Sequence, residues 1–333
     1  MSGNVNTPLL QDRSGNVLPF GSAQVQDHPI FLRVCHSPWS WLSQGTLVYL
    51  RAGIVAYLTA VGGMLIDYKI NHRGDDAHTS WRILFQFSSL AFVLLWLYHF
   101  IAFCWGFTHL YYPDVEEDDQ SWESRVLLKM SPPVQTARSR KRFYFSLFYT
   151  IVHVVVFMNA LIFWTVLVPQ DHGHLPKGHE AESYSDVGDF FSDGWFEPFC
   201  VLNLWVFTTF LASAEILVLN SVKRQVPVPS HVFAIIFFLS CYIGWAAFGK
   251  IVTDHYPFFW MDPEAMGKKE IVAAYASGFV GLGPTVFAFM YGLIGMRENL
   301  TKKDDSSSQF KQSPVQSRQA NIDEDFQRGN AQV

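Results

Sequence analysis

Six long apolar segments, separated by polar or charged clusters, dominate the pattern of the chain. Each has about 20 to 26 residues, which is enough for a helix to cross the roughly 30 Å hydrocarbon core of a bilayer. The pattern therefore predicts an all-α membrane protein with six transmembrane helices in a bundle. The expected spans are 46–66, 83–106, 143–168, 196–220, 231–253 and 271–296.

The two ends of the chain differ from this middle part. Residues 1–37 are rich in Asn, Gln, Ser, Gly and Asp, and residues 301–333 in Ser, Gln, Asp and Lys. Such segments carry too little apolar surface to fold alone. We expect disordered tails around one membrane domain at 38–300, and no cleaved signal peptide, because the N-terminal tail lacks an apolar run.

Composition supports the same class of protein. Hydrophobic residues make up 50% of the chain and charged residues only 16%, whereas charged residues run near a quarter in soluble domains. This excludes an ordinary soluble enzyme. The net charge of −5 gives no uniformly basic surface, so we expect membrane lipid and not nucleic acid as the partner. Protein partners through the tails stay open, as does the oligomeric state.

The distribution of Lys and Arg predicts the orientation. Sixteen lie on the side of the two tails and the loops at 107–142 and 221–230, against six on the other side. The positive-inside rule then places both termini in the cytosol. The expected location is the plasma membrane or a eukaryotic endomembrane. The basic cluster from Arg138 to Arg142 gives the strongest local signal; topology alone accounts for it, and binding of anionic lipid headgroups is the alternative.

No cofactor or metal is predicted. The four cysteines show no metal-binding spacing. The loop at 169–195 contains His172, His174 and His179, which are typical of a solvated loop, with a metal site as the alternative.

Ionisable side chains inside spans are costly and are the default candidates for function. Arg51, His99, His153 and Glu215 come from four different spans, and all fall in the cytosolic half of the bilayer. One interpretation is a shared polar cavity in which Arg51 and Glu215 form an ion pair. In the other, Arg51 reaches up to the interface and each histidine bonds to a neighbouring helix.

The fourth span has the richest polar set: Asn203, Thr208, Thr209 and Glu215. Thr208 and Glu215 are seven residues apart, so they share a helix face, which must contact protein or water. Each threonine taken alone is more typical of a hydroxyl bonded to its own backbone. In the sixth span, the pairs Ala274/Gly278 and Ser277/Gly281 place small residues four apart, which permits close contact with another helix.

The chain resembles the androgen-induced and rolling-stone-like family of multipass membrane proteins, most closely over 195–262. The resemblance rests on Leu202-Asn203, Thr208-Thr209, Glu215, Lys223-Arg224, Cys241-Tyr242-Ile243-Gly244-Trp245, Thr253 and Tyr256-Pro257-Phe258. It implies an intramembrane hydrolase of fatty-acid esters with a threonine nucleophile and a histidine base.

At both of those positions this chain departs from the family. The family histidine aligns with Phe207 and the nucleophilic threonine with Tyr49, with Thr46 one turn away. Because a hydroxyl needs a nearby base to become a nucleophile, either His153 serves as a relocated base for Thr208 or Thr209, or this branch does not hydrolyse.

These features together predict a protein that binds a lipid-like amphiphile in a polar intramembrane cavity. The predicted binding residues are Arg51, His99, Asn203 and Glu215. The alternatives are a lipid ester hydrolase using Thr208, Thr209 and His153, and a transporter, although no internal repeat of the kind many transporters show is visible.

Overall fold

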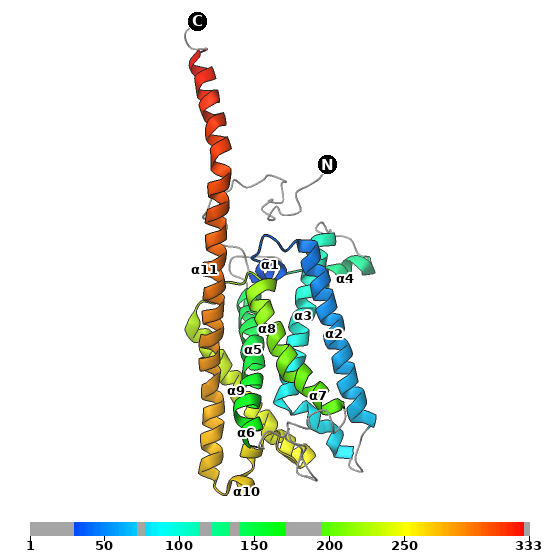
Figure 1. Ribbon diagram of the computed structural model, residues 1–333. Helices are drawn as coiled ribbons and strands as arrows, with labels where there is room; N and C mark the ends of the chain where they lie inside the picture. The colour runs from blue at the N-terminus through cyan, green and yellow to red at the C-terminus, as the bar shows by residue number, and fades with distance from the viewer. Residues whose placement is uncertain (1–29, 72–76, 113–120, 134–139, 171–194, 330–333) are drawn as a thin grey trace.

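The computed structural model describes residues 30–71, 77–112, 121–133, 140–170 and 195–329, and every element in these ranges is helical. Six helical segments are long and apolar enough to span a membrane, as the sequence predicts. The protein is therefore a multi-pass membrane protein (Figure 1). Five of these segments lie in α2 (Gln44–Asn71), α3 (Phe87–Tyr111), α5 (Arg140–Ile162) with its π-helical continuation Phe163–Leu167, α9 (Val228–Thr253) and α11 (Lys269–Gly329).

The remaining span, the fourth, is the least regular. It consists of α7 (Phe196–Val201), a π-helical segment (Leu202–Phe207), α8 (Thr208–Ala214) and a second π-helical segment (Glu215–Leu219). π-Helical turns inside α-helices are rare and occur frequently at functional sites. This span contains the polar set singled out in the sequence.

Helix α5 lies at the centre of the bundle and contacts α3, α8, α9 and α11, whereas α2 packs mainly on α3. The arrangement follows from the side chains, because α5 is buried over most of its length, from Phe145 to Ile162. Many of these residues are β-branched or aromatic and belong to the main apolar core. The third span, at the centre of the bundle, is thus the most deeply buried of the six.

A short helix, α1 (Ile30–Cys35), lies ahead of the predicted start of the membrane domain. It falls inside the segment expected to be a disordered tail, yet Phe31 and Val34 are buried. The Phe31 ring packs edge-on against the Trp105 ring, with the ring centroids 5.2 Å apart, and also contacts Phe145. This short apolar turn is ordered because α3 and α5 offer it an apolar surface.

Figure 1 places α1, α4 (Trp122–Met130) and the C-terminal extension of α11 at one end of the bundle. Helix α11 runs on past Thr301, where its span ends, to Gly329. The disorder predicted for 301–333 stays a prediction, and residues 1–29 lie outside the described part. The opposite end is formed by η2 (Ala77–Leu84), α6 (Val168–Gln170), α7 and α10 (Pro263–Met266).

Close helix contact in the sixth span occurs at Gly283, not at the predicted glycines. A Cβ added there would lie 2.5 Å from Leu239 Cδ1 and 2.7 Å from Ile235 Cγ2, both on α9. A Cβ at Gly278 or Gly281 would meet nothing within 4 Å. The spacing of small residues was present, but the contact with α9 involves a different face of the helix.

Candidate functional site

The fourth span ends inside the protein, and this buried end organises the site. The last carbonyl groups of any helix lack partners within the helix. Here side chains from three other parts of the chain donate to them. The bonds are Ser37 Oγ to Val218 O (2.7 Å), Trp39 Nε1 to Leu217 O (2.8 Å), Arg51 Nη2 to Leu219 O (3.0 Å) and Arg297 Nη1 to Ile216 O (2.7 Å).

Arg51 and Glu215 form the ion pair that the sequence predicts. The Arg51 Nη2 atom lies 2.8 Å from Glu215 Oε1, and both side chains are fully buried. The same nitrogen donates to the carbonyl of Val34 at 2.8 Å, which ties α1 to the pair. The alternative in which Arg51 reaches the interface is therefore wrong.

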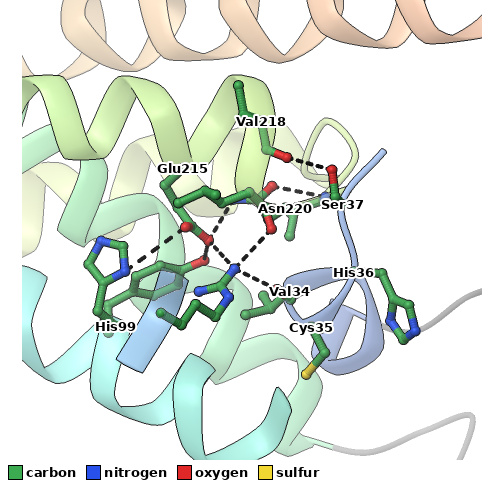
Figure 2. A network of polar contacts seen from close by, with 12 residues as sticks. Val34, Cys35, His36, Ser37, His99, Glu215, Val218 and Asn220 are labelled. Atoms are coloured by element: carbon green, nitrogen blue, oxygen red, sulfur yellow. Dashed lines mark hydrogen bonds and ion pairs between the residues drawn. The ribbon is translucent and has the colours of Figure 1, made fainter. Parts of the chain in front are cut away.

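Further polar side chains converge on the Glu215 carboxylate (Figure 2). Tyr98 donates its hydroxyl to Oε1 at 2.6 Å, and Asn220 donates its amide at 3.2 Å. His99 Nδ1 lies 4.0 Å from Oε2. Four elements, α2, α3, the end of the fourth span and the segment after it, thus meet at one carboxylate.

His153 lies beside this network on α5. Its Nδ1–H donates to the carbonyl of Tyr149 at 2.8 Å. Its ring packs against the rings of Tyr98 and Tyr149, with centroids 5.1 and 4.3 Å apart. We call Arg51, Tyr98, His99, His153, Glu215 and Asn220 the polar network.

Within the described part of the chain, several atoms of the polar network are buried without a hydrogen-bond partner. Burying a polar atom without a hydrogen-bond partner costs free energy, so such atoms are rare in folded proteins. Yet six of them belong to four neighbouring side chains of this one network. They are Arg51 Nε and Nη1, His99 Nδ1 and Nε2, His153 Nε2 and Glu215 Oε2.

The remaining predicted site residues are placed differently. Asn203 donates to Phe199 O at 2.8 Å and accepts from the hydroxyl of Tyr57. It lies twelve residues before Glu215, or about 18 Å along a helix. Asn203 is therefore bonded in a separate layer and makes no hydrogen bond to the polar network.

The two threonines bond to their own helix. Thr208 donates to Leu204 O at 2.8 Å and Thr209 to Trp205 O at 2.7 Å. Among the described residues, no hydrogen bond joins either hydroxyl to His153. Thr208 and Glu215 are both buried, as expected for two residues on one inward-facing side of the fourth span. The catalytic role of these three residues stays a prediction.

The two positions that the sequence resemblance aligned with catalytic residues, Phe207 and Tyr49, face outward. Phe207 is 42% exposed and Tyr49 is 70% exposed. The hydroxyl of Thr46 lies 2.8 Å from that of Ser43. These positions are separate from the polar network.

Sequence reasoning missed Arg297, one residue beyond the predicted end of the sixth span. It is 2% exposed, and its Nη1 also donates to Asn220 O (2.8 Å) and Asn220 Oδ1 (3.0 Å), while Nη2 donates to Val222 O. An arginine directly after an apolar span looks like a topology signal. The only sequence feature that pointed to its partner was Asn220, a polar residue at the end of the predicted fourth span.

A second buried polar cluster, also missed, joins α5 to the start of α9. The ring of His231 lies between the hydroxyls of Ser146, 3.2 Å from Nε2, and Thr150, 2.9 Å from Nδ1. Gln225 accepts from Ser146 at 2.5 Å. Each side chain has a partner, so this cluster serves to join two helices.

Helix α1 borders the polar network at Val34 and contributes two titratable neighbours. Burial raises the pKa of the Cys35 thiol to about 12. Burial likewise lowers the pKa of His36, which bonds to Leu32 O at 2.9 Å. Both shifts favour the uncharged form of the side chain.

Within the described residues, no group of three or more His, Cys, Asp or Glu side chains is placed to hold a metal ion. The histidines of the loop at 169–195 lie outside the described residues. Comparison with known protein families, curated proteins and solved structures finds no match for this chain. The fold and the site define a six-span membrane protein with a buried ionic network inside its bundle.

Proposed function

We propose that the protein binds a lipid-like amphiphile within the membrane, with the polar head of the ligand at the polar network. The observation that carries this proposal is the group of six unpartnered buried atoms on Arg51, His99, His153 and Glu215. The hydrocarbon core offers no water, so such atoms need a polar partner from elsewhere. A ligand head would supply it.

The unpartnered atoms also indicate the chemistry of that head. Arg51 Nε and Nη1 are donors only, whereas Glu215 Oε2 accepts. The histidine nitrogens take either role according to the tautomer. A head that carries both an acceptor and a hydroxyl or amide donor satisfies this set, while the apolar chain of the ligand packs among the aromatic side chains of the bundle.

This proposal includes two further expectations. The order of motifs over 195–262 supports membership of the androgen-induced and rolling-stone-like family, and the distribution of basic residues supports cytosolic termini. Ester hydrolysis is not part of it, because both threonine hydroxyls are bonded within their own helix.

The test compares lipid that co-purifies with the wild type and with His99→Phe, by native mass spectrometry in detergent. His99 makes no hydrogen bond in the described structure, although its Nδ1 lies 4.0 Å from Glu215 Oε2. Its replacement therefore removes two nitrogens that lack hydrogen bonds and leaves the Arg51–Glu215 pair intact. We expect at least a tenfold loss of the bound amphiphile. Leu97→Phe on the same helix, at a surface position, is the matched control and should retain it.

Thermal unfolding gives an independent outcome. If the network were dry and empty, replacing an unpaired buried imidazole by an apolar ring would raise the unfolding temperature. A more stable His99→Phe protein with unchanged bound lipid would refute the proposal.

A further inference from the structure

An open groove of about 500 Å³ lies between α5 and α9, on a surface that the polar network does not share. Phe143 and Leu147, four residues apart, line it from α5. From α9 it is lined by Pro229, Phe233 and Phe237, again at four-residue spacing, with Ser230 and Ala234 beside them. Phe233 and Phe237 are 70% and 62% exposed, so the aromatic wall faces outward.

The groove begins where the two helices begin. Helix α5 starts at Arg140 and α9 at Val228. Phe237 is nine residues into α9, so the groove extends about 13 Å along the helix. It therefore runs from the end of the bundle into the apolar layer, which is the path of an acyl chain below its headgroup.

Basic side chains stand at the open end of this groove. Arg140, Lys141 and Arg142 are exposed in the first turn of α5. Arg140 lies three residues before Phe143, and hence on the same face of the helix. Long basic side chains keep their charge at the headgroup level while their stems cover apolar surface.

We propose that the α5–α9 groove binds an anionic phospholipid, with an acyl chain between Phe143 and Phe233 and the phosphate at Arg140 to Arg142. Charge complementarity selects the anionic headgroup, and the apolar lining selects a lipid over a soluble phosphate. The site shares no residue with the polar network, so a test of one site does not decide the other.

The test titrates the full-length protein in detergent with phosphatidylserine or phosphatidylcholine and counts bound lipid by native mass spectrometry. We compare the wild type with Arg140→Gln/Lys141→Gln. Removing two headgroup contacts should weaken phosphatidylserine binding about thirtyfold at low ionic strength. Binding of phosphatidylcholine should not change.

Arg125→Gln/Lys129→Gln is the matched control, because it removes one Arg and one Lys that are exposed on α4. It should leave phosphatidylserine binding as in the wild type. An equal loss in both double variants would show a non-specific charge effect and overturn the proposal.

Two further arms test the groove itself. Ala234→Trp fills it and should abolish the preference for phosphatidylserine while the protein stays folded by thermal unfolding; unchanged preference in the folded variant overturns the site. Soluble glycerophosphoserine should not displace the lipid at equal concentration, and displacement would show a site for free phosphate esters instead.

Discussion

At the scale of single residues, Arg297 shows how a charge is held inside the bundle. Its guanidinium donates to the carbonyls of Ile216, Asn220 and Val222 at the buried end of the fourth span. Cations are stabilised at helix C-termini, where the carbonyl dipoles concentrate negative potential. Arg297 therefore replaces water as the partner of these groups.

Arg297→Gln should destabilise the protein by about 2–4 kcal/mol, because several buried carbonyls lose a charged donor. Arg224→Gln is the matched control: its side chain is 45% exposed and pairs with Glu298 at 3.0 Å, so its loss should cost about 0–1 kcal/mol. Unfolding in detergent, followed by circular dichroism, measures both. Equal losses would contradict the role assigned to Arg297.

Cys35 gives a pH-dependent prediction. Because burial raises the pKa of its thiol to about 12, the reactive thiolate does not form in the folded protein between pH 7 and about 10. In a variant that keeps only Cys35, iodoacetamide should therefore label the folded protein much more slowly than the protein unfolded in dodecyl sulfate, at every pH in this range. In dodecyl sulfate the thiol has its ordinary pKa, so labelling should level off above about pH 9; equal rates for the folded and unfolded protein would show an exposed thiol.

The sequence predicts those site residues whose ionisable side chains would be costly to place inside a membrane span. Arg51, His99, His153 and Glu215 stand out in apolar spans, and the structure brings them together. Arg297, Tyr98 and Asn220 could not be found this way, since an arginine at a span end, a tyrosine within a span and an asparagine before a loop are all common. Their role depends on which helices are neighbours, and the pattern of one sequence does not contain that information.

At the scale of the elements, hydropathy predicted the six spans because each must bury its own backbone polar groups in lipid. Helix α1 was missed, since six residues are too few to give a periodic signal and it is ordered by contact with α3 and α5. The π-helical segments of the fourth span were missed too, because periodicity rules assume a regular α-helix.

The close packing of α11 on α9 predicts opposite effects at two nearby glycines. Gly283→Ala places a methyl group against Leu239 and Ile235 and should cost about 1–3 kcal/mol through overpacking. Gly281→Ala meets nothing within 4 Å, and it should be neutral or slightly stabilising because alanine favours a helix. Thermal unfolding of the two variants compares them directly; a destabilised Gly281→Ala with a neutral Gly283→Ala would reverse the assigned packing.

At the scale of the whole molecule, the account predicts the orientation of the bundle. The sequon Asn299-Leu300-Thr301 lies at the end of the membrane span of α11 and should carry no glycan if this end faces the cytosol. A sequon inserted near residue 180, on the opposite side of the predicted topology, is the control and should be glycosylated. A glycan at Asn299 would invert the orientation.

The central claim is that the polar network holds the head of a bound amphiphile. An experimental density map of the protein purified in mild detergent tests it most directly. We expect elongated non-protein density with its polar end within hydrogen-bond distance of Arg51 Nη1 and Glu215 Oε2. A map at side-chain resolution with no such density, in which these two atoms and the ring of His99 pair with protein groups instead, would contradict it.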